Sequence, residues 1–339
     1  MTLLKNIPFL FIACLFIGLI SCSDDDPIVE EEEMESPCGT EIYGVNVFTE
    51  VSVSTHVYGN GLSVLGNPTE LSLDVYQPVG DTSTSRPVIA WAFGGSFIGG
   101  DRTQMASFAT TYAEKGFVCV AMDYRLLNVL INGIPDSLEA LDIAVKASHD
   151  IKAAVRYMRQ DAATENLFKI DPDKIFLGGL SSGGIASVQA AMFTQEDLDD
   201  ASPFVANIIN SNGGLEGLSG DAENLTYSSA VSGVISLSGG VYSLDFIDAG
   251  DPPIISYHGN NDAIVPYGFG FANVLGINLV SINGSGVIHP HCESIGLDNE
   301  LYTIVGGDHN MIYTDALYAN DRAAFETNTA MFLSNIICE

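Results

Sequence analysis

The chain has 339 residues, 47% of them hydrophobic and 16% charged, enough for one large α/β domain or two smaller ones. Acidic residues outnumber basic ones so strongly that the formal net charge is −31. A surface of this sign repels a phosphate backbone, so nucleic acid is excluded as a partner, and we interpret the charge as an aid to solubility.

The first 21 residues have the pattern of an export signal. Lys5 precedes the apolar run Pro8–Ile20, which has signal-peptide length and is short for a membrane span. The run leads into Leu19-Ile20-Ser21-Cys22, which resembles the lipobox of bacterial lipoproteins and implies acylation of Cys22. Several acyl chains on one residue would anchor the protein stably to the membrane. The alternative is cleavage near Ser21 and release of a soluble protein.

Residues 22–37 are predicted to form an acidic tether. Residues 23–37 carry eight acidic side chains and no basic one, so they cannot bury enough apolar surface to fold. Ser23-Asp24-Asp25-Asp26 resembles the acidic tag that sends some Gram-negative lipoproteins to the outer face of the outer membrane. We therefore expect a surface-exposed, lipid-anchored protein whose folded domain spans 38–339.

From residue 43 onward, strand-like and helix-like runs alternate. The runs at 87–93 and 117–124 are continuous and apolar, as in strands buried on both faces of a parallel sheet. The other predicted strands lie at 43–58, 70–76, 174–177, 231–237, 253–257 and 300–305, and the predicted helices at 138–159, 185–192 and 321–337. This alternation predicts the α/β class, with a doubly wound, mostly parallel sheet and helices on both faces.

The segment 194–229 interrupts the alternation. It is polar and rich in Asn, Gly and Ser. We consider two alternatives for it: a small cap inserted over the active site, and a plain surface excursion.

Cysteine usage leaves room for one disulfide. Cys119 lies in an apolar run and is expected to be a buried thiol. Cys38, Cys292 and Cys338 remain in an exported protein, where a disulfide can persist. Cys292–Cys338 would fasten the C-terminal segment, but sequence alone does not decide the pairing.

A candidate nucleophile lies between the predicted strand 174–177 and helix 185–192. Gly179-Leu180-Ser181-Ser182-Gly183 fits G-x-S-x-G, in which a sharp strand-to-helix turn holds the serine hydroxyl clear of the backbone. Glycine and serine are common, so an ordinary turn is the alternative. The flanking strand and helix are the context that the motif requires, and they favour Ser181 as a nucleophile.

A serine hydroxyl needs a base to take its proton. His309 lies in a glycine-flanked loop directly after the predicted strand 300–305, at the edge where ligands bind such sheets. The other five histidines are less suited: His56, His149, His258, His289 and His291. His258 is expected to be a structural hydrogen-bonding residue, and no Cys or acidic residue accompanies His289 and His291 at a metal-ligand spacing. We expect no metal site.

The base needs an acid to orient it, and Asp262 is the candidate. It lies in a loop after the predicted strand 253–257, and the order Ser, Asp, His is the one this arrangement of strands uses. Its carboxylate would accept a hydrogen bond from the imidazole and fix the ring tautomer. Asp251 and Asp308 are the alternatives, and a turn-forming role is the alternative for any Asp in such a loop.

An oxyanion hole is expected from the glycine-rich stretch after the strand 87–93. Glycines let backbone N–H groups approach a bound ester oxygen closely. We expect the amides of Gly95 and Ser96 to donate, together with that of Ser182 beside the nucleophile. The alternative is a merely flexible glycine loop.

Together these motifs resemble the α/β-hydrolases of the carboxylesterase and hormone-sensitive-lipase kind. The family commonly has His-Gly-Gly-Gly in the oxyanion loop, Ala-Gly-Gly after the nucleophile, and an acid in D-x-x-V-P. The matching stretches in this chain are Phe93-Gly94-Gly95-Ser96, Tyr124-Arg125, Asp150–Tyr157, Ile170–Ile175, Ser182-Gly183-Gly184 and Asp262-Ala263-Ile264-Val265-Pro266. Phe93 and Ser96 depart from the family pattern, but the expected donors are backbone amides. The resemblance spans about residues 70–335.

The resemblance implies a serine ester hydrolase that acts through an acyl-enzyme and needs no metal or organic cofactor. We expect short-chain acyl or carbohydrate-linked esters as substrates, and no membrane contact beyond the lipid anchor. Two alternatives remain: a peptidase or amidase of the same fold, and a surface binding protein that has lost catalysis.

Overall fold

The computed structural model describes residue 43 and residues 46–221 and 223–338. These residues belong to one compact unit. The predicted signal peptide, Cys22, the tether and Cys38 lie outside the described residues, so these predictions and the domain boundaries stay predictions. Among the residues that are described, no helix has the length and apolarity needed to cross a bilayer.

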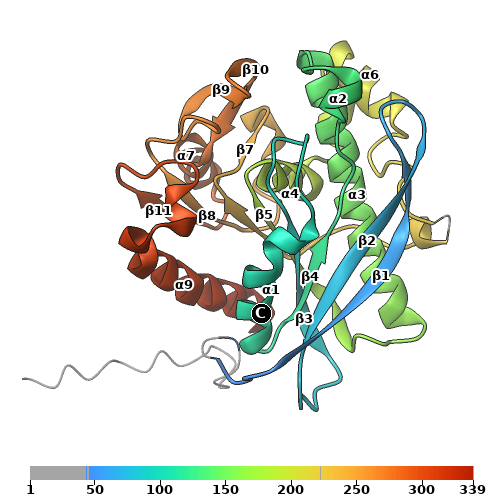
Figure 1. Ribbon diagram of the computed structural model, residues 1–339, viewed down its shortest axis with the longest axis vertical. Helices are drawn as coiled ribbons and strands as arrows, with labels where there is room; N and C mark the ends of the chain where they lie inside the picture. Colours follow the sequence, from blue (N-terminus) through green and yellow to red (C-terminus); the bar gives the residue numbers. More distant parts are fainter. Residues whose placement is uncertain (1–42, 44–45, 222, 339) are drawn as a thin grey trace, which may run out of the picture. The chain divides into compact units, whose positions relative to one another are not determined.

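An eight-stranded sheet organises the fold (Figure 1). β2 is antiparallel to both of its neighbours, β1 and β4, and all the other neighbours pair in parallel. The predicted mostly parallel sheet is therefore confirmed. In spatial order the strands are β1 (Val51–Leu62), β2 (Pro68–Pro78), β4 (Val118–Met122), β3 (Arg86–Ala92), β5 (Ile170–Leu180), β6 (Gly233–Leu237), β8 (Ile254–Gly259) and β11 (Asn299–Ile304).

Helices connect the strands, and the three predicted ones are present as α3, α4 and α9. Helix α3 starts where it does because of a capping box, in which Asp136 accepts from the N–H groups of Leu138 and Glu139 and the Glu139 carboxylate accepts from that of Asp136. The helices are α1 (Ala106–Glu114), α2 (Val129–Asn132), α3 (Ser137–Ala163), α4 (Ser182–Met192), α5 (Gln195–Asp200), α6 (Pro203–Ser211), α7 (Ser285–Ile295), α8 (Met311–Thr314) and α9 (Ala319–Cys338), with 3-10 turns at Arg102–Met105, Asn224–Thr226, Leu244–Phe246 and Ala316–Tyr318.

The core lies on both faces of the sheet, because successive side chains of a strand point in opposite directions. On β8, Ile254 packs with Val188 of α4 and Ile288 of α7. Tyr257 points the other way, and its ring centroid lies 5.0 Å from that of Phe325 on α9. Because both faces of the sheet are covered, β3 is buried at every position and appears in the sequence as one apolar run.

Two parts of the fold differ from the sequence-based prediction. The first strand begins only at Val51, since the N–H groups of Val47 and Phe48 instead donate to the carbonyl of Glu114. A second sheet was not predicted. It consists of β7 (Gly240–Val241) and the hairpin of β9 (Phe269–Val274) and β10 (Ile277–Gly284), which we call the 269–284 hairpin.

The segment 194–229 is fastened to helix α3 by basic side chains. The Lys152 ammonium donates to the carbonyl of Leu215 at 3.0 Å, and the Arg156 guanidinium pairs with Glu216 at 2.8 Å. Arg156 is fully buried, so these contacts hold the segment firmly against the helix.

The pairing of Cys292 with Cys338, which the sequence analysis considered, is wrong. Cys292 is a buried free thiol that packs with Ile288 and other apolar residues between α7 and the sheet. Cys338 is disulfide-bonded. Cys119 is a buried free thiol, as predicted.

Candidate active site

Ser181 lies on the turn between β5 and α4, at the carboxyl end of the central strand. Its backbone has φ 55° and ψ −119°, a conformation that residues other than glycine rarely adopt. The turn is held by a hydrogen bond from its N–H to the carbonyl of Leu237 at 2.8 Å. This geometry turns the serine side chain toward the pocket described below, of which Ser181 is a lining residue.

The glycines of the motif are needed because other backbone segments approach them closely. A Cβ atom on Gly183 would lie 2.3 Å from the carbonyl oxygen of Ala92, and one on Gly179 would lie 2.3 Å from that of Gly183. Both distances are far below van der Waals contact. Glycine at 183 therefore lets the turn fit against β3, and glycine at 179 lets the turn close on itself.

The structure brings the three predicted residues together. The Nε2 atom of His309 lies 2.9 Å from Ser181 Oγ, and its Nδ1 atom lies 2.6 Å from Asp262 Oδ2. Strands β8 and β11 pair in parallel, so the loops that follow them, with Asp262 and His309, emerge side by side. An imidazole in this position can accept the hydroxyl proton while its other nitrogen donates to the carboxylate.

Four donor groups surround the Asp262 carboxylate, which matches the number of its lone-pair sites. Its Oδ1 atom accepts from the N–H groups of Ile264 at 2.8 Å and Val265 at 3.0 Å, and Oδ2 accepts from His309 at 2.6 Å and lies 3.2 Å from His258 Nε2. Burial by itself would raise the pKa of Asp262, but the hydrogen bonds from the two histidines outweigh it and lower the pKa to about 2.

The competing acids have other partners, and three of the competing histidines lie within helices. Asp251 accepts from the N–H of Asp248, and Asp308 accepts from the N–H groups of Asn310 and Met311. His149 lies within α3, and His289 and His291 within α7. Within the described part of the chain, no three His, Cys, Asp or Glu side chains are grouped so as to hold a metal ion.

The predicted oxyanion loop lies against the nucleophile. A Cβ atom on Gly94 would lie 3.1 Å from that of Ser181, and Ser96 lines the same pocket as Ser181 and Ser182. Ser96 and Phe97 have φ values of 58° and 61°, so two successive residues hold a left-handed conformation. Ser182 is the first residue of α4, so its N–H has no acceptor within the helix.

Phe93, which stands where the family commonly has His, belongs to a buried aromatic pair. Its ring stacks on Tyr124 with centroids 4.2 Å apart. The Tyr124 hydroxyl donates to the carbonyl of Phe93 at 2.7 Å and lies 3.2 Å from Ser182 Oγ. Tyr124 therefore ties the oxyanion loop to the start of α4. The sequence motif Tyr124-Arg125 marked this residue without revealing the contact.

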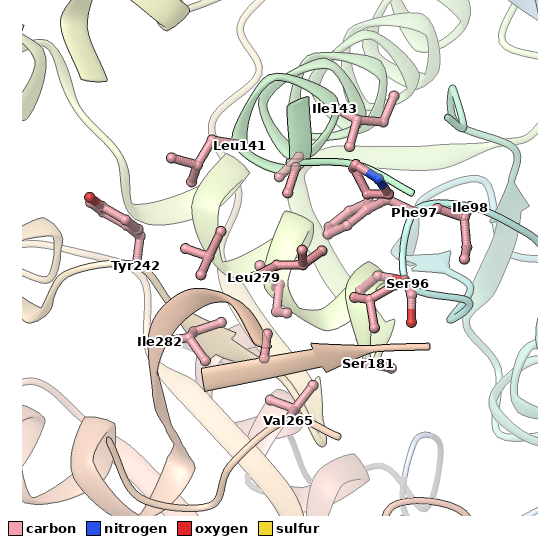
Figure 2. Close-up of a pocket in the computed structure, with 18 of the residues that line it drawn as sticks. Ser96, Phe97, Ile98, Leu141, Ile143, Ser181, Tyr242, Val265, Leu279 and Ile282 are labelled. Atoms are coloured by element: carbon pink, nitrogen blue, oxygen red, sulfur yellow. The ribbon is translucent and has the colours of Figure 1, made fainter. Parts of the chain in front are cut away.

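An apolar pocket of about 110 Å³ leads away from Ser181. Figure 2 shows Leu141 and Ile143 of α3 on one side of it and Val265 and Ile282 on the other, with Ser181 near one end. No charged side chain is found among the described residues that line it, which include Phe97, Ile98, Pro135, Ala140, Ala144, Val145, Ile185, Tyr242, Ala272, Val274, Leu279 and Val280.

The 269–284 hairpin forms one wall of this pocket, through Ala272, Val274 and Leu279 among others. None of the described residues between 194 and 229 lines it, so the pocket offers no support for a cap there. The hairpin escaped prediction because its run 269–284 is interrupted by Gly270, Gly276 and three asparagines. A hairpin turn at Leu275-Gly276 was the available signal.

The comparisons with known proteins agree with this fold. The BD-FAE family model matches residues 73–214. The propionate-bound esterase 2 of the planctomycete Thermogutta terrifontis is similar to this chain with 21% identity and a TM-score of 0.59, over 84% of this chain and 94% of that one. The same esterase phosphorylated by paraoxon is similar with 21% identity and a TM-score of 0.58, over the same shares of the two chains. The comparison with curated proteins found no match. This chain therefore has the α/β-hydrolase fold, as these esterase structures do.

Proposed function

We propose that this protein is a serine carboxylic-ester hydrolase that acts through an acyl-enzyme. The observation that carries the proposal is the continuous line of hydrogen bonds from Ser181 through His309 to Asp262, 2.9 Å and 2.6 Å long. Both contacts have the lengths of good hydrogen bonds, and the line ends at an apolar pocket that can take an acyl group.

The reaction has two halves. In the first, Ser181 Oγ attacks the ester carbonyl carbon while its proton passes to His309 Nε2. The tetrahedral intermediate collapses, the C–O bond to the alcohol breaks, and the alcohol leaves with the proton from His309. In the second half a water molecule attacks the acyl-serine with His309 again as the base, and the carboxylic acid is released. Asp262 stays ionised throughout, in keeping with its lowered pKa of about 2.

The negative charge that forms on the carbonyl oxygen in the tetrahedral intermediate has to be stabilised by hydrogen-bond donors. We assign this role to the backbone N–H groups of Gly95, Ser96 and Ser182. Proximity supports the assignment, since Ser96 and Ser182 line the pocket beside Ser181. Each such donor typically contributes about 3 kcal/mol to the stability of the transition state.

The pocket favours a small, uncharged acyl group. Its volume of about 110 Å³ and the absence of charged residues among its described lining suit short aliphatic chains. Propionate bound to the similar esterase 2 supports this choice. With the acyl group in this pocket, the alcohol side of the ester would extend outside it, and we include carbohydrate-linked esters among the candidates.

We further propose that the protein is lipid-anchored at the bacterial outer membrane through Cys22 and exposed at the cell surface. The support is the sequence Leu19-Ile20-Ser21-Cys22 and the acidic residues that follow. Incorporation of labelled palmitate into the wild type and its loss in Cys22→Ala test this proposal.

Ester and amide turnover of one acyl group tests the function. The purified protein should hydrolyse 4-nitrophenyl esters from acetyl to hexanoyl and cleave the matching anilides far more slowly. Comparable rates on both would indicate an amidase, and turnover of neither would indicate a binding protein.

A further inference from the structure

A second histidine contacts the carboxylate of Asp262. His258, near the end of β8, is fully buried, and its Nε2 atom lies 3.2 Å from Asp262 Oδ2 and 3.1 Å from the carbonyl oxygen of Val265. Its Nδ1 atom lies 2.9 Å from Ser285 Oγ. All the nitrogens of the ring therefore have partners in the interior.

These contacts fix the tautomer of His258. Both atoms near Nε2 are acceptors only, so this nitrogen carries the proton and donates to them. In the neutral ring Nδ1 then carries no proton and accepts a hydrogen bond from the Ser285 hydroxyl. The ring has the opposite tautomer to His309, whose Nδ1 donates to the same carboxylate.

The partners of His258 lie at the two ends of one segment. Val265 precedes the 269–284 hairpin, and Ser285 is the first residue after it. Backbone bonds also close the base of the hairpin, from Gly284 N–H to the carbonyl of Gly268 and from Gly286 N–H to that of Tyr267. One buried ring thus contacts the candidate catalytic acid and both ends of the segment that forms a wall of the acyl pocket.

We propose that His258 is a positioning residue that holds the Asp262 carboxylate for His309 and fixes both ends of the 269–284 hairpin. The inference rests on the proposed function. Without the N–H of His258, only His309 would contact Oδ2, and the carboxylate would be held less firmly in the orientation that His309 needs. Its charge would also be less neutralised, so it would stabilise the protonated form of His309 more strongly.

The contacts of the two ring nitrogens of His258 can be tested separately. The amide nitrogen of Gln reaches the place of Nε2, so His258→Gln keeps a donor to Asp262. Asn reaches only the place of Nδ1, so His258→Asn keeps a partner for Ser285 and loses the donor. Ser285→Ala removes only the contact at Nδ1, with the C-terminal end of the hairpin. The other titratable groups near His258 and Asp262 are Tyr267, His289 and Tyr313.

The experiment measures kcat and kcat/KM of the four full-length proteins on acetyl and hexanoyl esters from about pH 5 to 9, together with thermal unfolding. We expect His258→Asn to lose about tenfold in kcat and to move the acid limb of kcat/KM to higher pH, because a hydrogen bond to a charged group is lost. His258→Gln should keep the wild-type limb. Ser285→Ala should keep the limb and change the ratio of hexanoyl to acetyl turnover by about 2- to 5-fold.

The inference would be overturned if His258→Asn kept both the wild-type kcat and the wild-type acid limb of the kcat/KM profile. It would also be overturned if Ser285→Ala displaced that acid limb. Should His258→Asn fail to fold, the profile of His258→Gln decides, because a displaced limb there contradicts the role of the N–H donor and a wild-type limb supports it. A wild type that hydrolyses no ester would instead refute the proposed function, so the two failures are distinguishable.

Discussion

The Nε2 atom of His309 lies 2.9 Å from the Oγ atom of Ser181, although 128 positions of sequence separate the two residues. Neither residue is near the other along the chain, and each follows a different parallel strand of the sheet, β11 or β5. The contact therefore depends on the whole sheet being assembled. The proposed proton relay has consequences that single substitutions can measure.

Removing the hydroxyl of Ser181 should abolish ester hydrolysis without unfolding the protein. We expect Ser181→Ala to lower kcat on short-chain 4-nitrophenyl esters at least about 10³-fold, because no other group replaces the nucleophile. Ser187→Ala is the matched control, since Ser187 lies on the same helix α4 and its hydroxyl bonds to the carbonyl of Gly178. Ester turnover by Ser181→Ala at the wild-type rate would contradict the assignment.

Asp262, which contacts His309, and Asp308, which precedes it in the sequence, should respond differently to replacement by asparagine. Asp262→Asn would offer an N–H to His309 Nδ1 and impose the wrong tautomer, so we expect kcat to fall about 10³- to 10⁴-fold. Asp308→Asn should stay close to wild type, because an amide oxygen can still accept from Asn310 and Met311. Steady-state kinetics on one ester compare them. Equal losses in both variants would show that Asp262 has no special role.

The turn at the nucleophile should not tolerate a methyl group. In Gly183→Ala the new Cβ would lie 2.3 Å from the carbonyl oxygen of Ala92, so either β3 or the turn must move. We expect a loss of about 2 kcal/mol or more in the free energy of unfolding, measured in urea. Gly250→Ala has open space around it and should unfold like the wild type. A Gly183→Ala protein as stable as this control would show that the contact is wrong.

Filling the pocket should change the preference for acyl length. Ala144 lines the pocket on α3, and Ala144→Phe would occupy much of its volume of about 110 Å³. We expect kcat/KM for the hexanoyl ester to fall about tenfold or more, and that for the acetyl ester to fall less. The control is Ala323→Phe, the same substitution at an exposed position of α9. If both esters lose activity equally, the acyl group binds elsewhere.

Asp251 should make stability depend on pH. Burial raises its pKa to about 6, and the neighbouring carboxylates of Asp248 and Asp197 contribute in the same direction. The folded protein then holds a proton that the unfolded chain releases near its usual pKa, so stability falls as the pH rises from about 4 to 6. Asp251→Asn should be about 1 kcal/mol more stable than wild type at about pH 8 and no more stable at about pH 4. Urea unfolding at both pH values tests this, and an equal difference at both would contradict it.

Much of the fold was predictable because the central strands are buried on both faces. β3 and β4 appear in the sequence as continuous apolar runs, and α3 has both helical spacing and its capping box. The 269–284 hairpin could not be recognised in this way. It has partly exposed faces, so neither a continuous run nor a clear alternation marks it.

The predicted site residues were found from short motifs that have a steric or chemical reason. Gly179 and Gly183 are dictated by the close approach of backbone, and Asp262 by the N–H groups of Ile264 and Val265. The contacts of His258 with Ser285 and of Tyr124 with Ser182 were not predictable, because they join residues on separate elements with no sequence pattern of their own.

Covalent labelling with paraoxon, which phosphorylates the similar esterase 2, can identify the nucleophile without any substitution. We expect mass spectrometry of the digested protein to find one diethyl phosphoryl group, on Ser181, and esterase activity to be lost in proportion to its occupancy. Activity that survives full modification of Ser181, or a phosphoryl group on another residue that accounts for the lost activity, would contradict the proposed role of Ser181.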